Sequence, residues 1–176
     1  MVTTTKWGKW GLLVLTACFC LPALLACTAE QHGTTMASDN TMQMKKVIDG
    51  REELMRNTSG HFKDLQQKAK GGQLAQIAVN AQTIAINARH IPALFPAGST
   101  GSPEDKSRAK AEIWQDWNGF TADAKQLEDA ATKLMQLTEN ADKMGATSAQ
   151  VNTAVKAVGE ACKSCHKKFR APKKKK

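Results

Sequence analysis

The sequence predicts an all-α protein folded as an up-down-up-down four-helix bundle. Four stretches of the chain repeat their apolar residues at alternating steps of three and four, which is the rhythm of an amphipathic helix. Turn signals rich in glycine and proline separate several of these stretches. Alanine, leucine and lysine are common, β-branched residues do not cluster, and there is no tyrosine, a composition that favours helices. Long amphipathic helices with short connections favour a bundle.

The first two predicted helices cover about residues 42–70 and 73–91. The first ends at a pair of glycines and the second ends before a proline, and both residue types stop helices. Arg51 interrupts the apolar face of the first helix. A charged group on such a face requires a polar partner or a route to solvent.

The third predicted helix covers about residues 104–140, and Gly119 indicates a bend within it. The fourth begins near Ser148, which we expect to be its N-cap, and ends before Pro172. The apolar face of the fourth helix contains Val151, Val155, Val158, Cys162, Cys165 and Phe169. Both cysteines are therefore expected to point towards the apolar side.

The N-terminus has the features of an export signal. Two lysines precede an apolar run at residues 11–26 that is too short for a comfortable membrane-spanning helix. The run ends in Leu24-Leu25-Ala26-Cys27, which resembles the lipobox of bacterial lipoproteins. We therefore expect residues 1–26 to be a signal peptide and Cys27 to carry the lipid. The alternative is ordinary signal cleavage nearby, for instance after Ala29.

The rest of the chain divides into three parts. Residues 28–41 are polar and predict a tether, residues 42–172 form the helical domain, and residues 173–176 are a basic tail. The formal net charge of +9 and the tail favour acidic redox partners or anionic lipid. Because we expect the protein in the periplasm, anchored to a membrane by the lipid, nucleic acid is not an expected partner.

Cys162, Cys165 and His166 form a C-x-x-C-H motif, which is the attachment motif of c-type haem. On a helix the two cysteines lie one turn apart, so both sulfurs can add to the haem vinyl groups while His166 ligates the iron. A thioredoxin-like dithiol would need a βαβ context, and structural zinc would need four ligands. Neither pattern is visible, so we predict one covalent haem c near the end of the fourth helix.

The motif and its surroundings resemble the class II cytochromes c, the cytochrome c′ family, over nearly all of residues 42–171. The resemblance rests on Val158-Gly159-Glu160-Ala161-Cys162-Lys163-Ser164-Cys165-His166-Lys167-Lys168-Phe169-Arg170, on Ile113-Trp114 with Phe120, and on Arg51-Glu52-Glu53-Leu54-Met55. It implies a four-helix bundle, one haem with a histidine on one side and a variable distal side, and a homodimer through the first two helices.

Met55 lies at the position where the low-spin, electron-transfer branch of that family has a distal iron ligand. In the other branch the distal side is empty and apolar, and takes small gases such as nitric oxide. Counting from the helix ends at about 1.5 Å per residue also brings Met55 within roughly two turns of the haem level. We predict that Met55 binds the iron. The alternative is a core residue in the apolar seam, which is the commoner fate of methionine.

Five further residues of the bundle are expected near the haem. Arg51 is predicted to pair with a haem propionate through charge-assisted hydrogen bonds, and the alternative is that it snorkels to solvent. Arg170 resembles the family's basic residue after the motif and is expected at a propionate or at the proximal side of the haem. From their level in the bundle, the residues predicted to line the pocket are Ile84, Ala88 and Trp117.

These features predict single-electron transfer by a haem protein that is not an enzyme. The protein's part is to fix the axial ligands, exclude water and set the potential. The alternative is a five-coordinate haem that binds nitric oxide or another small diatomic gas for sensing or protection. A catalytic haem such as a peroxidase needs polar distal groups, and Arg51 is the only candidate for that role in the sequence.

Overall fold

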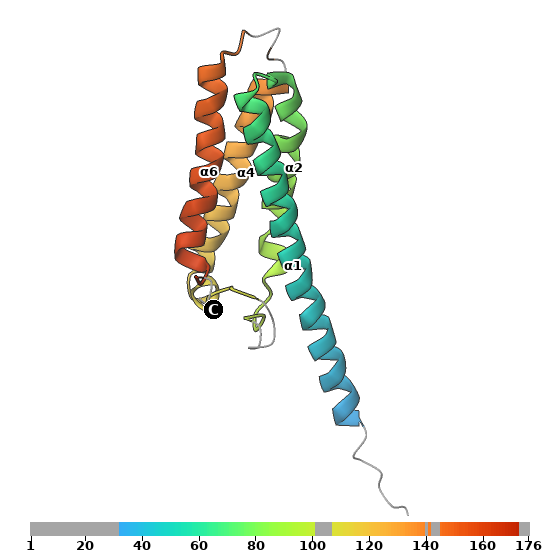
Figure 1. Ribbon diagram of the computed structural model, residues 1–176. Helices are drawn as coiled ribbons and strands as arrows, with labels where there is room; N and C mark the ends of the chain where they lie inside the picture. Colours follow the sequence, from blue (N-terminus) through green and yellow to red (C-terminus); the bar gives the residue numbers. More distant parts are fainter. Residues whose placement is uncertain (1–31, 101–106, 140, 142–144, 173–176) are drawn as a thin grey trace, which may run out of the picture.

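A computed structural model describes residues 32–100, 107–139, 141 and 145–172, with side chains from residue 39 onward. The helices run alternately up and down (Figure 1). Its helical elements are α1 (His32–Lys70), η1 (Leu74–Gln76), α2 (Ile77–His90), η2 (Pro92–Leu94), α3 (Glu112–Gln115), α4 (Trp117–Glu139) and α6 (Ser148–Phe169). Over these residues the β-structure is confined to one isolated bridge between Ala109 and Arg170. The prediction of an all-α four-helix bundle is confirmed.

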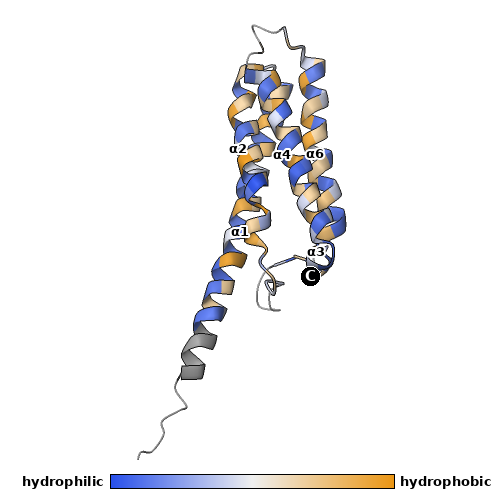
Figure 2. Cartoon of the chain, turned by 180° about the vertical axis from the view of Figure 1, so that it is seen from behind, coloured by the Kyte–Doolittle hydropathy of each residue, from blue (hydrophilic) through white to orange (hydrophobic). Residues whose placement is uncertain are grey.

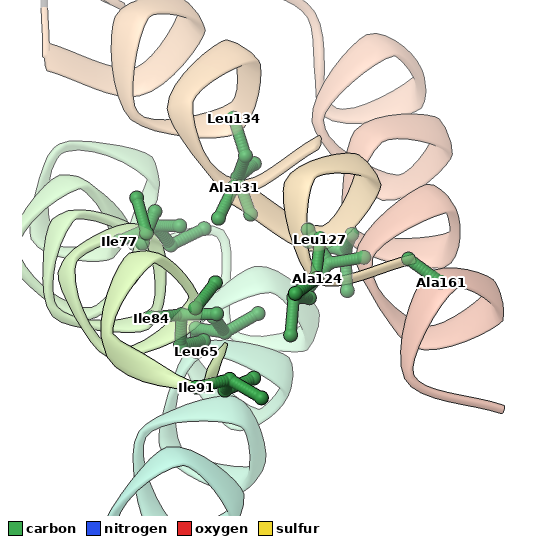
Figure 3. Packing of buried hydrophobic residues seen from close by; sticks show 14 of the residues in the cluster. Leu65, Ile77, Ile84, Ile91, Ala124, Leu127, Ala131, Leu134 and Ala161 are labelled. Carbon is green, nitrogen blue, oxygen red and sulfur yellow. The ribbon is translucent and has the colours of Figure 1, made fainter. Parts of the chain in front are cut away.

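The core runs along the bundle axis where the apolar faces of the helices meet (Figure 3). Its fully buried side chains include Leu65, Ile77, Ile84, Ile113, Leu134, Val151 and Val158. Buried alanines on α2 and α4 let these two helices approach closely, because their side chains are short. Complete burial of each large aliphatic side chain stabilises the fold by about 1.5–3 kcal/mol.

Helix α1 begins ten residues before the predicted start at Met42 and extends past the bundle (Figure 2). Among the described side chains Ile48 is the first that is buried, and Met42 is 56% exposed. The described side chains of residues 39–43 are all exposed, which agrees with the lack of apolar periodicity in this part of the sequence. The tethering role of residues 28–41 stays a prediction, and residues 28–31 lie outside the described part.

The predicted third helix is wrong at its start, and the bend that Gly119 indicated is a complete break three residues earlier. Residues 107–110 are extended, α3 begins at Glu112, and the chain breaks at Asp116, whose φ of −120° and ψ of 61° are not helical. The Asp116 carboxylate then accepts the backbone N–H of Gly119 at 2.9 Å. A Cβ on residue 119 would collide with this carboxylate, so glycine permits the break three residues earlier. Residues 101–106 and 140 lie outside the description.

Helix α6 begins with a capping box, and its N-cap is Thr147 rather than the predicted Ser148. The Thr147 hydroxyl accepts the backbone N–H of Gln150 at 3.3 Å, and the Gln150 side chain accepts the backbone N–H of Thr147 at 2.8 Å. Each bond satisfies a donor that the first turn of a helix leaves open. Among the described helices, none is both long and apolar enough to cross a membrane.

Candidate haem site

The C-x-x-C-H motif occupies the last two turns of α6. Cys162, Cys165 and His166 are each half-buried, and neither thiol is in a disulfide. Two buried phenylalanines fix this end of the helix, since the Phe169 ring meets the edge of the Phe120 ring with centroids 5.4 Å apart. The two thiols and the imidazole therefore lie together on a helix end that is packed against the core.

A pocket of about 580 Å³ opens beside the motif. Its lining residues are Arg108, Gly159, Cys162, Lys163, His166, Lys167, Arg170, Ala171 and Pro172. The pocket falls within the size range of cofactor sites, about 300–1,000 Å³. It brings together three of the predicted site residues, Cys162, His166 and Arg170.

An extended strap, residues 107–110, contributes Arg108 to the lining of this pocket. The backbone N–H of Lys110 donates to the carbonyl of Phe169 at 3.0 Å, and the N–H of Ala171 donates to the carbonyl of Arg108 at 2.8 Å. These bonds hold Arg108 beside His166. The sequence did not identify Arg108, because its neighbourhood was assigned to a helix and no motif marks it.

The charges around His166 favour its neutral form. Burial first, and then the guanidinium groups of Arg170 and Arg108, lower the pKa of the His166 imidazole. Neutral imidazole is the form whose nitrogen lone pair can bind iron. Burial also raises the pKa of both thiols, that of Cys165 to about 12 with further contributions from Asp123 and Cys162. The cysteines therefore rest as neutral thiols before any attachment.

Arg51 is buried, at 3% exposure, and points to the segment after α2 rather than to solvent. Its guanidinium donates to the hydroxyls of Ser99 and Ser107, each at 3.2 Å, and also to the carbonyl of Ser99. It lies over the Phe95 ring, 4.7 Å from the centroid. The snorkelling alternative is therefore wrong, whereas the pairing with a propionate stays a prediction.

The relative level of α1 and α6 follows from one close contact. A Cβ on Gly159 would lie 3.0 Å from Cζ of Phe62, so the two helices touch there. Towards the motif they diverge (Figure 1). The helices are antiparallel, so seven residues back along α1 and seven forward along α6 both advance about 10 Å in one direction. These steps lead to Met55 and His166, which therefore lie at the same level.

The other predicted residues lie away from the pocket lining described above. Met55 is half-buried and packs against the core, while Ile84 and Ala88 are fully buried within it. Trp117 is 39% exposed, and its ring lies tilted against that of Phe120 with centroids 5.6 Å apart, because the break at Asp116 changes the helical phase. Their roles around a haem stay predictions.

The chemistry of this site fits a c-type haem. Two free thiols one turn apart, an adjacent imidazole favoured in its neutral form, and a pocket beside them are what covalent attachment and iron ligation require. Guanidinium groups at the rim suit carboxylate groups such as haem propionates. In the part of the chain that the structure describes, no group of three or more His, Cys, Asp or Glu side chains gathers into a separate metal site.

Comparisons with known proteins agree with this chemistry. The profile of the family described as Cytochrome C′ matches residues 46–170. A cytochrome c′ of Rhodospirillum rubrum is 33% identical over 150 residues, covering 84% of this chain and 96% of that protein. A cytochrome c-556 of Agrobacterium fabrum is 32% identical over 130 residues, covering 72% and 82%.

The fold is similar to that of solved members as well. A cytochrome c′ whose structure shows an unusual ligand-controlled dimer dissociation superposes with a TM-score of 0.65 at 26% identity. The match covers 73% of this chain and 97% of that one. This chain is therefore a member of the cytochrome c′ family, whose proteins bind a covalent c-type haem with iron.

Proposed function

We propose that the protein is a single-electron carrier whose haem is attached through Cys162 and Cys165 and ligated by His166 and Met55. The haem supplies an iron that alternates between the ferrous and ferric states. The observation that carries the proposal is the common level of Met55 and His166, which follows from the contact between Phe62 and Gly159. A histidine and a methionine at one level can act as two axial ligands.

The residues of the chain have separate tasks in this proposal. Cys162 and Cys165 hold the ring through thioethers, so the affinity of His166 for iron does not have to retain the cofactor alone. His166 and Met55 together would keep the same two protein ligands on the iron in both oxidation states, which would favour fast electron transfer. The buried rings of Phe120 and Phe169 limit the access of water to this end of the helix.

Arg51 supports the same arrangement from α1. It lies one helical turn before Met55, and the level argument places it opposite Arg170. We propose that its guanidinium pairs with a propionate while its bonds to Ser99 and Ser107 hold it in place. Five donors on one guanidinium allow both sets of bonds.

An optical spectrum with a methionine variant tests the proposed ligation. Wild-type ferric protein should be low-spin with a thioether-to-iron charge-transfer band at long wavelength, and Met55→Ala should become high-spin and bind carbon monoxide. Met135→Ala is the matched control, because Met135 is also a half-buried methionine packed against the core. A high-spin wild-type spectrum at neutral pH, unchanged by Met55→Ala, would reject the ligation.

The second candidate function is reversible binding of nitric oxide or another small diatomic gas. It is favoured by the packing of Met55 against the apolar core, since a methionine used in this way leaves the distal position open. Wild type would then be five-coordinate and admit the gas directly. Met55→Ala would change the rate of gas binding without changing the coordination number.

We also propose export to the periplasm and anchoring by lipid at Cys27. The support is the lipobox-like Leu24-Leu25-Ala26-Cys27 after an apolar run. Native protein should fractionate with membranes, and Cys27→Ser should release it or block processing. Wild-type protein found wholly in the soluble periplasmic fraction would refute the anchor and leave the haem site untouched.

The partners that we propose are an acidic redox protein and a second copy of the chain. Four basic residues line the pocket at the motif, Arg108, Lys163, Lys167 and Arg170, and opposite charge would guide such a partner. For the homodimer, Val79 and Ile86 are exposed on one face of α2, at 66% and 46%. Replacing both with glutamate should yield a monomer in sedimentation, whereas Lys133→Glu on α4 should not.

A further inference from the structure

A buried carboxylate that is not part of the pocket lining contacts the last turn of α6, next to the haem motif. Asp123 of α4 is 7% exposed, although it occupies the apolar face of the helix between Phe120 and Leu127. Burial of a carboxylate is costly unless a partner compensates its charge. The position of Asp123 therefore needs an explanation.

The partner of Asp123 is Lys168, in the last turn of α6. The Lys168 ammonium lies 3.0 Å from each carboxylate oxygen and donates a hydrogen bond to Oδ1. Oδ2 is within reach of the same charge, but no hydrogen-bond donor among the described residues is aligned with it. The carboxylate is thus held firmly and is only partly neutralised.

The ion pair acts directly at the haem attachment segment. Lys168 follows His166 by two residues and Cys165 by three, and the Asp123 carboxylate contributes to the raised pKa of the Cys165 thiol. Both cysteines pack against the core, but of the two only Cys162 also lines the pocket. Through its contact with Lys168, Asp123 therefore places a fixed negative charge next to the turn of α6 that holds Cys165 and His166.

The two charges of the pair do not cancel equally. The Asp123 side chain is 9% exposed and that of Lys168 is 49% exposed. Solvent and salt screen the exposed ammonium more strongly than the buried carboxylate. The pair therefore contributes a net negative electrostatic potential in the protein interior. A negative potential stabilises the extra positive charge of an oxidised iron.

We propose that Asp123 is a positioning residue for electron transfer, whose buried carboxylate, fixed by Lys168, orders the last turn of α6 and holds the haem potential low. This rests on the proposed attachment of haem at Cys162, Cys165 and His166. Stability alone does not explain the pair, because apolar replacements of buried ion pairs are often neutral or stabilising.

A redox titration of the full-length haem-loaded protein tests the inference. Asp123→Asn keeps the shape of the side chain and an acceptor for Lys168 but removes the charge. Asp123→Ala removes both the charge and the acceptor, and alanine is well tolerated in a helix. Both variants should have a higher potential than wild type. Asp129→Asn is the matched control, because Asp129 is an exposed carboxylate of the same helix paired with Lys125, and it should leave the potential unchanged.

The outcomes separate the two proposals. Haem-loaded Asp123 variants with the wild-type potential, or with shifts in opposite directions, would overturn the role of Asp123 and leave the proposed function standing. If the Asn variant does not fold, the Ala variant decides alone in the same way. Wild-type protein without covalent haem, detected by intact mass before any titration, would overturn both.

Discussion

Helices α6 and α1 both contribute to the proposed haem site, but they do so in different ways. The chemistry of α6 lies in five consecutive residues, and helical geometry alone places Cys162, Cys165 and His166 together. The residues of α1 acquire their roles from packing, because Met55 comes level with His166 only through the contact of Phe62 with Gly159. Attachment of the cofactor is therefore a local property, whereas its distal ligand depends on how two distant segments pack.

The largest expected effect comes from removing the two cysteines of α6 that we expect to attach the haem. Replacing both Cys162 and Cys165 with alanine should abolish covalent haem completely, because no thiol remains to add to the vinyl groups. Haem should then be extracted from the denatured variant by acid and organic solvent, and intact mass should equal that of the bare polypeptide. Ser164→Ala, between the two cysteines, is the control and should keep the haem. Haem that stays bound in the double variant would disprove the assigned attachment.

A substitution on α6 can also test whether the packing of α1 against α6 sets the level of Met55. Gly159→Leu should leave haem attached but push Phe62 away, since even a Cβ at residue 159 would approach the Phe62 ring to 3.0 Å. Met55 should then lose its level with His166, and the ferric spectrum should gain high-spin character.

Gly60→Leu is the matched control for this experiment. A Cβ at residue 60 would meet nothing within 4 Å, so the same substitution in α1 should leave the spectrum as in wild type. A low-spin spectrum in Gly159→Leu, identical to that of wild type, would show that the position of Met55 does not depend on this contact.

The same contrast decides how far the sequence alone could lead. The fold class followed from helical periodicity and the haem from one contiguous motif, because both are local patterns. The start of α1 was missed, since it has no apolar pattern. Gly119 did indicate a bend in the third helix, but the break lies three residues earlier, at Asp116, because it depends on a carboxylate turning back to Gly119. Asp123 was also missed, although a carboxylate within an apolar face is the same signal that identified Arg51.

Substitution of Arg51, the other site residue that α1 contributes, should have a smaller effect. Arg51→Leu should lower the haem potential, because removing a cation near a propionate favours the oxidised, more positive iron. It should also reduce stability, since a hydrogen bond to a charged group contributes about 1.5–3 kcal/mol. Redox titration and urea unfolding measure the two effects separately.

Arg51→Lys sharpens this test because it keeps the charge and loses the forked bonding to Ser99 and Ser107. The haem potential of Arg51→Lys should stay close to that of wild type, whereas its free energy of unfolding should be lower. Equal potentials for wild type, Arg51→Lys and Arg51→Leu would mean that Arg51 serves only to hold the segment after α2.

The smallest expected effect concerns the end of α6 that is remote from the motif. Thr147→Ala removes the hydroxyl that accepts the Gln150 N–H and should destabilise the protein by about 1 kcal/mol, the usual contribution of an N-cap. Ser148→Ala is the control, because Ser148 lies within the helix and is not its cap. Urea unfolding should show a lower midpoint with an unchanged slope, which indicates a change in stability alone.

The spectrum and potential of Thr147→Ala should stay at their wild-type values, because α6 is held at its other end by Phe169, the strap and the ion pair of Lys168 with Asp123. A shift in spin state on Thr147→Ala would mean that fraying at one end of α6 reaches the haem end, and that the attachment and packing halves of the site are coupled through the helix itself.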